Sequence, residues 1–366
     1  MKIALYNLTT TVKNGGIETF CWGLARNLSS RGIEVDLYGG NSNKIFPSIK
    51  NLRVIPLPYI PRDKFPNFGS RFRKFMERLS FCYHAFPQIR KNRYNFFCIF
   101  KPFDLPLALL IKKIKSSKII FFSGGTEFFI GYKTMAKKID FFFSCSKFNA
   151  KQIEDYCGIK PLILPNGIDT ELFKPLQPAT KLKEFLEIDE EKILITVCRL
   201  VGWKGVQYGV KALKILLEKG YKIKYLIIGE GEYRRNLEKL VKDLEIREKV
   251  LFLGNIENSQ LPKYYSLAHI AIFPSIADET FGISIGEAMA CGVPVISTKV
   301  GGIPEVVGDA GILVNPKDEN AIAQSLEHLI TNPHIRNELA MRARKRIINL
   351  FSWEIIINKF LEHISA

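Results

Sequence analysis

Two carboxylates stand eight positions apart in the segment ETFGISIGEAMACGVPVIST, which begins at Glu279 and otherwise consists mainly of small and apolar residues. A helix is expected to begin near Gly282, so Glu279 precedes it and Glu287 lies a little over one turn inside it. The glutamates therefore flank a helix amino end, where the free amides of Phe281, Gly282 and Ile283 can bind an anion. Because carboxylates accept hydrogen bonds from hydroxyls, the arrangement suits a polyhydroxylated ligand that carries phosphate. Glu287 alone would equally serve to stabilise the helix dipole.

A cationic loop is the second candidate. The segment RLVGWKG, residues 199–205, follows the strand-like run KILITVC and precedes a helical segment. Arg199 and Lys204 would place a planar guanidinium and a compact ammonium at a helix amino end, which suits a diphosphate. A solvated loop would tolerate the same two side chains.

Glycine-rich turns are the third feature. Gly15 and Gly16 lie between the first strand and the first helix, where backbone amides can approach a phosphate without a Cβ in the way. Such a turn is also glycine-rich for steric reasons alone. Gly229 and Gly231 come nearest to the G-x-G-x-x-G pattern, but its third glycine is missing. A dinucleotide-dependent dehydrogenase is therefore disfavoured.

Strand-like and helical segments alternate along the chain, which predicts parallel sheets with helices on both faces, an α/β doubly wound organisation. The predicted N-terminal domain spans residues 1–172, with strands at 2–8, 33–40, 95–100, 118–122 and 139–144. Residues 173–191, with two prolines and mixed charge, are expected to form a linker. A second alternating series over 192–351 predicts the C-terminal domain, and a final helix over 352–366 is expected to pack back on the first. In such sheets ligands lie beyond the carboxyl ends of the strands, where the candidate loops are found.

Composition and charge restrict the function classes. The chain has 366 residues, 47% hydrophobic and 24% charged, as in a soluble globular protein large enough for two domains. Residues 1–178 carry 28 Lys and Arg against 12 Asp and Glu, whereas residues 179–366 carry 25 against 24. The basic half is expected to attract an anion, such as lipid headgroups, nucleic acid or a phosphorylated substrate. The seven scattered cysteines form no C-x-x-C pair, so neither a zinc site nor a disulfide framework is indicated.

Taken in order, these loops resemble the retaining glycosyltransferases of family four, which have the GT-B architecture of two facing Rossmann-like domains with a cleft between them. NGGIET resembles the glycine-rich loop after the first strand, and LPNGIDTELF resembles the PNGID…F segment before the hinge. VCRLVGWKG resembles the GRL…KG loop, VLFLGNI the strand ending at the base pocket, and ETFGISIGE the E-x7-E motif. EAMACGVPVIST…GGIPEVV and FSWE continue the match over nearly the whole chain.

This resemblance implies that a nucleoside-diphosphate sugar, UDP- or GDP-linked, is the donor. Glu279 would hold sugar hydroxyls, Glu287 the ribose hydroxyls, and the cations Arg199 and Lys204 the departing diphosphate. Arg199, Lys204 and Glu279 would form the catalytic set. The residues implied to contact the donor are Gly15, Gly16, Arg199, Lys204, Gly254, Asn255, Ile256, Glu279, Phe281, Gly282, Ile283 and Glu287.

The resemblance also implies hexosyl transfer with retention, by attack on the face from which the diphosphate leaves. No cofactor is expected, and the absence of a D-x-D motif favours metal-independent transfer. Many relatives carry a His-Gly pair after a middle strand of the first domain, where this chain has FFSGGTEFF. Thr126 or Glu127 would then contact the acceptor or act as acid or base.

Residues 68–94 predict a basic amphipathic helix with an aromatic and apolar stripe and with cations beside the stripe. The stripe consists of Phe68, Phe72, Phe75, Leu79 and Tyr83, and the cations are Arg71, Lys74 and Arg78. Such a helix favours an anionic membrane surface, where it would hold the enzyme beside a lipid-linked glycan acceptor. The same stripe could instead pack on the sheet. With no signal peptide and no apolar run of the roughly 18 to 20 residues that span a bilayer, the expected location is cytoplasmic, on the inner face of the membrane.

Three alternatives remain open. A GT-B epimerase would share the donor site, whereas a sugar phosphorylase would need a pyridoxal lysine environment that the sequence does not reveal. A nucleic-acid-binding protein could use the basic half, but no known RNA or DNA motif accompanies the charge, so no nucleic-acid partner is expected.

Overall fold

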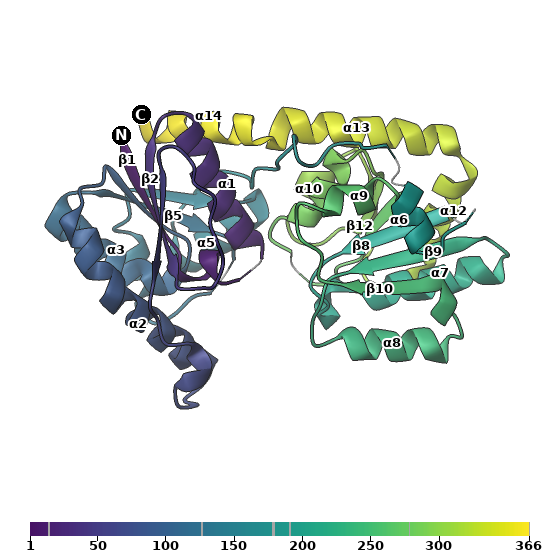
Figure 1. Ribbon diagram of the computed structural model, residues 1–366, viewed down its shortest axis with the longest axis horizontal. Helices are drawn as coiled ribbons and strands as arrows, with labels where there is room; N and C mark the ends of the chain where they lie inside the picture. Colours follow the sequence, from purple (N-terminus) through teal and green to yellow (C-terminus); the bar gives the residue numbers. More distant parts are fainter. Residues whose placement is uncertain (14, 126, 178–179, 190–191, 278, 366) are drawn as a thin grey trace. The chain divides into compact units, whose positions relative to one another are not determined.

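The fold consists of two compact units in a computed structural model that describes residues 1–13, 15–125, 127–177, 180–189, 192–277 and 279–365. Unit 1 comprises Met1–Gly167 and Trp353–Ala366, and unit 2 comprises Ile168–Ser352. Each contains a parallel sheet accompanied by helices (Figure 1). The predicted α/β doubly wound organisation is therefore confirmed in both units.

Unit 1 is built on a seven-stranded sheet in the order β3-β2-β1-β4-β5-β6-β7, and all neighbours are parallel. Its strands are β1 (Lys2–Tyr6), β2 (Glu34–Gly40), β3 (Leu52–Leu57), β4 (Phe96–Ile99), β5 (Lys118–Ser123), β6 (Phe141–Ser144) and β7 (Leu162–Ile163). Its helices are α1 (Gly16–Ser30), α2 (Ser70–Lys91), α3 (Leu105–Lys115), α4 (Tyr132–Ala136), α5 (Lys147–Cys157) and α14 (Trp353–Ser365), with short 3-10 turns η1 (Leu8–Thr11), η2 (Arg62–Lys64) and η3 (Pro102–Asp104).

The edge strands β3 and β7 were not predicted. Central strands such as β1 and β4 are continuous buried apolar runs, which are readily recognised. By contrast, β3 is only partly buried and contains Arg53 and Pro56, and β7 has two residues. Proline and charge are tolerated at a sheet edge, so the local pattern there is weak.

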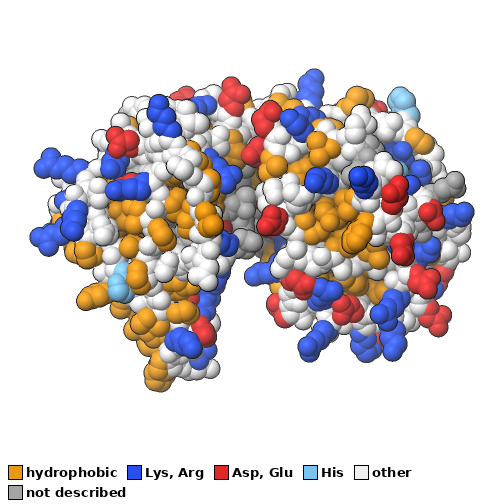
Figure 2. Space-filling view, viewed as in Figure 1, with side chains coloured by type: hydrophobic (Ala, Val, Ile, Leu, Met, Phe, Trp, Pro, Cys, Tyr) orange, Lys and Arg blue, Asp and Glu red, His pale blue; other side chains and the backbone are white. Residues whose placement is uncertain are grey.

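Exposed apolar side chains mark one face of α2. Phe68, just before the helix, is 76% exposed, and Tyr83 on the helix is 77% exposed. Phe75 and Leu79 are exposed as well. Figure 2 shows hydrophobic side chains gathered along the free end of this helix. Of the helices within the described ranges, none has both the length and the apolar character to span a bilayer.

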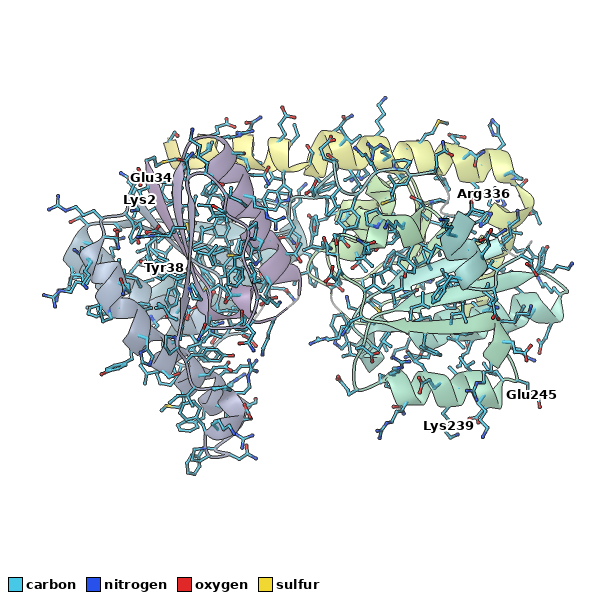
Figure 3. All side chains as sticks on the ribbon, viewed as in Figure 1. Lys2, Glu34, Tyr38, Lys239, Glu245 and Arg336 are labelled. Atoms are coloured by element: carbon cyan, nitrogen blue, oxygen red, sulfur yellow. The ribbon has the colours of Figure 1, made fainter. Side chains whose placement is uncertain are left out.

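A buried carboxylate joins the first strands of unit 1. Asp36 on β2 accepts two hydrogen bonds from Arg53 on β3, at 2.9 and 2.6 Å, and one from the Tyr94 hydroxyl at 2.5 Å. Tyr38 contacts Tyr94 in turn, with the two hydroxyl oxygens 2.7 Å apart. Lys2, which Figure 3 labels beside Glu34, places its ammonium 3.6 Å from the Asp36 carboxylate. The order β3-β2-β1 thus rests on charge pairing as well as on backbone hydrogen bonds.

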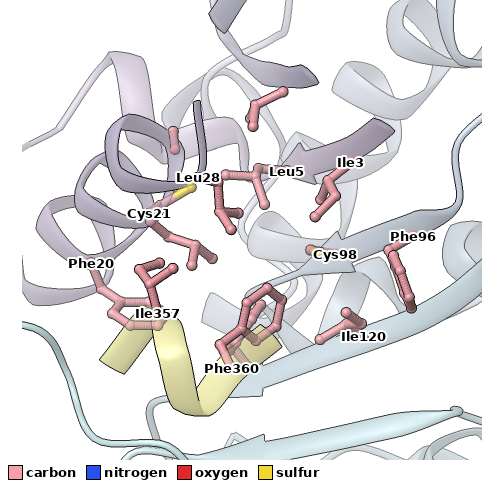
Figure 4. Packing of buried hydrophobic residues seen from close by; sticks show 14 of the residues in the cluster. Ile3, Leu5, Phe20, Cys21, Leu28, Phe96, Cys98, Ile120, Ile357 and Phe360 are labelled. Carbon is pink, nitrogen blue, oxygen red and sulfur yellow. The ribbon is translucent and has the colours of Figure 1, made fainter. Parts of the chain in front are cut away.

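The final helix α14 belongs to the core of unit 1. Ile357 and Phe360 of α14 pack with Phe20 and Leu28 of α1 and with Ile120 of β5 (Figure 4). The helix therefore buries an apolar face against both a helix and the sheet.

Trp353 at the start of α14 is held in a slot between two glycines. Its ring stacks on Phe20 with centroids 5.5 Å apart, and a Cβ on either Gly23 or Gly167 would overlap the indole. Only residues without a side chain can occupy these two positions while the indole stays where it is.

Unit 2 is built on a six-stranded parallel sheet in the order β10-β9-β8-β11-β12-β13. Its strands are β8 (Lys192–Val197), β9 (Ile223–Ile228), β10 (Val250–Gly254), β11 (Ile270–Phe273), β12 (Val295–Thr298) and β13 (Ile312–Val314). Its helices are α6 (Thr180–Phe185), α7 (Val206–Glu218), α8 (Arg234–Asp243), α9 (Leu261–Tyr265), α10 (Ile283–Ala290), α11 (Ile303–Val307), α12 (Glu319–Thr331) and α13 (Pro333–Phe351), with 3-10 turns η4 (Gly202–Lys204) and η5 (Arg247–Lys249).

The boundary between the units differs from the one predicted. Residues 168–191, which include the expected linker 173–191, belong to unit 2. Phe173 is buried against Tyr265, and Ile188 is buried as well. Ile168 donates its amide to the carbonyl of Phe351 at 2.7 Å, which ties the start of this segment to the end of α13. A few widely spaced apolar residues anchor the segment, and such anchors produce no periodic pattern.

We predict that Gly23→Ala destabilises the protein, although alanine normally stabilises a helix interior by about 1 kcal/mol relative to glycine. The added methyl group would overlap the Trp353 indole and displace α14. In a Trp353→Ala background the same change should become neutral or stabilising, because the clash is gone. Urea unfolding followed by far-UV circular dichroism gives both free energies of unfolding. The same destabilisation in both backgrounds would refute the slot as its cause.

Candidate functional site

The loops of unit 2 that carry the predicted donor residues end at one edge of the sheet. All its strands are parallel, so the turns after β8, β9, β10, β11 and β12 emerge on the same side. The chain runs outward from β8 through β9 to β10, and in the opposite direction from β11 through β12 to β13. The sheet therefore has its switch point between β8 and β11, the usual place for a ligand crevice in such folds.

The loop after β8 interlocks with the loop after β11. Gly205 has φ +70°, and a Cβ there would overlap the carbonyl oxygen of Pro274. Ile276 donates its amide to the carbonyl of Trp203 at 2.8 Å. Lys204 lies between these two contacts in sequence, so its backbone is held against the β11 loop.

The loop after β9 packs against the first residues of the loop after β8. A Cβ on Gly229 would overlap the carbonyl oxygen of Cys198, and one on Gly231 would overlap that of Leu200. Leu200 also donates its amide to the carbonyl of Glu230 at 2.9 Å. The two glycines that resemble a dinucleotide-binding pattern are therefore explained by close backbone packing.

Lys204 and Glu279 form an ion pair at the switch point. Both side chains are about one-fifth exposed, at 20% and 18%, so solvent can reach them. The backbone of Glu279 is held from the other side, since its carbonyl accepts a hydrogen bond from Gly302 at 2.7 Å. Gly301 has φ +57°, and a Cβ there would overlap the same carbonyl.

Arg199 is exposed, and the structure shows no ion pair for it among the described residues. Its charge, like those of Lys204 and Glu279, acts on the neighbouring Cys198. Burial raises the pKa of the Cys198 thiol to about 11, while the two cations lower it and Glu279 raises it. The three predicted catalytic residues thus surround one stretch of the sheet edge, with Lys204 and Glu279 in contact.

Helix α10 begins as predicted, with Gly282 at its N-cap in the left-handed region at φ +94°. The Phe281 side chain is buried and packs edge-on against Phe351, with ring centroids 5.6 Å apart. Phe281 therefore anchors the helix start through its ring. The first amides of α10, including that of Ile283, have no partner within the helix and are oriented to bind an anion.

Glu287 is buried in the second turn of α10, with 4% of its surface exposed. Burial raises the pKa of its carboxyl from 4.5 to about 7, although a hydrogen bond from Asn258 opposes the shift. The Asn258 amide nitrogen lies 3.2 Å from Glu287 Oε1. Helix-dipole stabilisation would not require such burial, and Asn258 is the hydrogen-bond partner that the structure shows for this carboxyl among the described residues.

The predicted base-binding residues lie at the end of β10 and directly after it. Gly254 has φ +66°, and its carbonyl accepts the Gly229 amide at 2.8 Å. The strand has an irregular register there, between Phe252 and Gly254. Asn255 is exposed and Ile256 partly buried, at the same sheet edge as Lys204 and Glu279.

Sequence reasoning missed Asn258 as a site residue and assigned no role to Gly301 and Gly302. The two glycines form a GG pair in the loop between β12 and α11, and that pair is a usable signal for close backbone approach. Asn258 has no comparable signal, because its contact with Glu287 spans 29 positions.

The remaining predicted residues lie in unit 1. Gly15 and Gly16 stand at the start of α1, where a Cβ on Gly15 would lie 2.6 Å from Glu18 Oε2. A carboxylate is therefore already present at this helix end, which disfavours a diphosphate there. Glu127 is exposed and pairs with Lys74. Thr126 lies outside the described residues.

The pKa of Glu127 is lower than usual. Burial would raise it, but the hydrogen bond and charge of Lys74, with the charges of Lys101 and Arg78, outweigh that effect. Glu127 is therefore ionised at neutral pH, which favours hydrogen-bond acceptance over donation of a proton.

Comparison with known proteins assigns the two halves separately. A family model described as Glycosyltransferase Family 4 matches residues 14–172, and one described as Glycosyl transferases group 1 matches residues 179–346. The chain is 34% identical over 198 residues, 53% of its length, to N-acetyl-alpha-D-glucosaminyl L-malate synthase of Bacillus anthracis, of which it covers 51%. The chain spans about half the length of the first curated relatives it matches.

A longer match is a GDP-mannose-dependent monoacylated alpha-(1-6)-phosphatidylinositol monomannoside mannosyltransferase of Corynebacterium glutamicum, 28% identical over 69% of this chain and 71% of that protein. The sucrose-phosphate synthase structure of Thermosynechococcus elongatus has a TM-score of 0.85 at 22% identity, over 100% of this chain and 98% of that chain. This likeness concerns the fold alone. Because the two family models cover both halves and the fold agrees, the chain belongs to the group 1 glycosyltransferases and has their two-domain, Rossmann-like GT-B fold.

Proposed function

We propose that this glycosyltransferase is a retaining hexosyltransferase that moves a sugar from a UDP- or GDP-sugar to a lipid-linked or otherwise membrane-proximal glycan. The observation that carries the proposal is the ion pair of Lys204 and Glu279 at the switch point of unit 2. One relative is named as a GDP-mannose-dependent mannosyltransferase, which supports a nucleotide-sugar donor. Another is named N-acetyl-alpha-D-glucosaminyl L-malate synthase, which supports the formation of a sugar conjugate.

Donor binding would separate the ion pair. The diphosphate would take the ammonium of Lys204, and the sugar hydroxyls would donate hydrogen bonds to the carboxylate of Glu279. In the free protein the two side chains satisfy each other. Because each is partly exposed, a ligand can reach and exchange these contacts.

Charge stabilisation is the main chemical demand. When the anomeric C–O bond breaks, positive charge develops on the sugar and negative charge on the departing phosphate oxygen. Lys204, Arg199 and the amino end of α10 would stabilise that oxygen, and this supports transfer without a bound metal ion. The acceptor hydroxyl would attack the same face of C1 and pass its proton to the leaving diphosphate.

Glu287 would bind the ribose hydroxyls. The carboxyl is buried and has a single amide partner, so its oxygens have lone pairs left to accept hydrogen bonds from two hydroxyl groups. Gly254, Asn255 and Ile256 would contact the base, and Ile283 the phosphate through its amide. In unit 1, Glu127 would accept a hydrogen bond from the acceptor; we keep Gly15 and Gly16 as weaker donor contacts because of Glu18.

The exposed stripe of α2 supports contact with an anionic membrane surface on the cytoplasmic side. Phe68, Phe75, Leu79 and Tyr83 are all at least 40% exposed, so these four side chains do not pack on the sheet, whereas Phe72 is partly buried. The flanking cations differ from those predicted. Arg78 is buried and pairs with Asp104, because the helix turns this side chain toward the loop after β4.

Lys204→Ala is expected to lower kcat by about 10²- to 10³-fold, because an oriented positive group would no longer stabilise the leaving phosphate. Release of nucleoside diphosphate from UDP- and GDP-sugars measures the effect. A thermal-shift screen with UDP and GDP identifies the donor class, since a ligand present at 100 times its Kd adds about 2.7 kcal/mol of stability. Lys211→Ala removes the lysine of another ion pair in unit 2 and should leave kcat unchanged. Full activity of Lys204→Ala would exclude the assigned role.

Glu287→Gln should stabilise the free protein increasingly as pH rises. The pKa of the Glu287 carboxyl is about 7 in the folded protein and ordinarily 4.5. Between these two pH values the carboxyl ionises in the unfolded chain but stays protonated in the folded protein, so the free energy of unfolding of the wild type falls as pH rises. The difference between variant and wild type should grow by about 3 kcal/mol from pH 4 to pH 8. Urea unfolding across this range measures it, with the exposed Glu232→Gln as a control. A difference independent of pH would show that the carboxyl is not perturbed.

The protein is expected to bind vesicles that contain phosphatidylglycerol and to be released by salt, since exposed charges are screened. Phe68→Ser should weaken binding by roughly 10- to 100-fold, as expected for losing one buried aromatic ring. Ile355→Ser, at an exposed apolar position on α14, is the matched control. Co-sedimentation measures both, and equal loss in the two variants would contradict a specific role for α2.

A further inference from the structure

A carboxylate lies beside the end of β10 in unit 2. Glu230 belongs to the loop after β9, and its side chain is 40% exposed. A Cβ on Gly254, the last residue of β10, would lie 3.1 Å from Glu230 Oε1 and 3.9 Å from Arg234 Nη1. The charged ends of both side chains therefore occupy the space that a side chain at Gly254 would crowd. The proposed donor site assigns this position to the base.

The backbone of Glu230 is held by its neighbours. Its carbonyl accepts the amide of Leu200 at 2.9 Å, and the preceding residue, Gly229, donates its amide to the last carbonyl of β10 at 2.8 Å. A Cβ on the following residue, Gly231, would overlap the carbonyl oxygen of Leu200. Glu230 therefore lies on a packed loop and precedes α8, which begins at Arg234.

Arg234 pairs with two carboxylates. Its Nη1 pairs with Glu230, and its Nε donates to Glu238 Oε1 at 2.8 Å. The guanidinium also lies over the Phe252 ring, 5.8 Å from the centroid. The charges of the two glutamates and the arginine sum to −1. If Glu230 turns to a ligand, Arg234 keeps Glu238 as its partner, so no cation is left unpaired and the cost of the exchange is low.

The ion pair presents hydrogen-bond acceptors and donors side by side. The carboxylate of Glu230 offers two acceptor oxygens, and the guanidinium of Arg234 offers only donors. Among the common nucleobases, guanine alone has two adjacent donors, N1–H and the N2 amino group, next to an acceptor, O6. A carboxylate beside a guanidinium matches that edge. Uracil has a carbonyl oxygen on either side of its N3–H, so a carboxylate that accepts this proton would also face an oxygen.

We propose that Glu230 binds the N1–H and the N2 amino group of guanine, with Arg234 donating to O6, and that the donor is therefore a GDP-sugar. This inference rests on the proposed function and names the base of its donor. Glu230 and Arg234 are specificity-determining residues in this arrangement, because neither belongs to the Lys204–Glu279 ion pair.

The test compares the wild type with Glu230→Ala in isothermal titrations with GDP, inosine diphosphate and UDP. Inosine diphosphate lacks the N2 amino group and is otherwise identical to GDP, so it isolates one of the two contacts with Glu230. Asp243→Ala is the matched control, because it removes the carboxylate of another ion pair on α8, formed with Lys239 at 2.7 Å. Both carboxylates are at least 40% exposed, so the variants should fold, which circular dichroism verifies.

We expect the wild type to bind GDP roughly 10- to 100-fold more tightly than UDP, and roughly tenfold more tightly than inosine diphosphate, because a site built for a donor rejects a base that lacks it. Glu230→Ala should bind GDP roughly 10- to 100-fold less tightly and should no longer distinguish GDP from inosine diphosphate. Asp243→Ala should behave as the wild type.

Tighter binding of UDP than of GDP by the wild type would overturn the inference and leave the proposed function standing. An unchanged preference of Glu230→Ala for GDP over inosine diphosphate would overturn the role of Glu230. Binding of none of the three nucleotides by the wild type would count against the donor site itself, and the inference would fall with it.

Discussion

Close backbone packing at the carboxyl edge of the second sheet is the constraint on which the site depends. Gly205, Gly229, Gly231 and Gly301 each occupy a position where a Cβ would overlap a carbonyl oxygen of a neighbouring loop. These contacts link the turns after β8, β9, β11 and β12 into one layer. Lys204 and Glu279 meet because their backbones are clamped in this layer, before any ligand is present. A preorganised pair of this kind is what charge stabilisation in a transition state requires.

Burial separates the roles of the two glutamates. Glu279 is partly exposed and ion-paired, so its charge is satisfied in the free protein and remains within reach of solvent. Glu287 is buried with one amide partner, and its pKa is raised to about 7. Two carboxylates eight residues apart thus have different electrostatic states, because one lies on a loop at the surface and the other inside a helix packed in the core.

Unit 1 contains charged networks of its own. Its first three strands are joined by a fully paired network at Asp36, which belongs to the stability of the sheet. At the other end, beyond β1 and β4, Lys101 remains without an ion pair among the described residues. The aromatic stripe of α2 stays outside both, exposed along that helix.

The sequence by itself determined the order of strands and helices, the two α/β units and the residue types at the loop ends, because alternation of apolar runs and glycine-rich turns is a local property. It could not place the edge strands or the boundary at Gly167 and Ile168, which depend on a few anchors. Only the tertiary structure decided that Arg78 turns inward to Asp104 and that Asn258 reaches Glu287. Burial and charge pairing sum over residues far apart in the chain, so neither can be derived from the spacing within one segment.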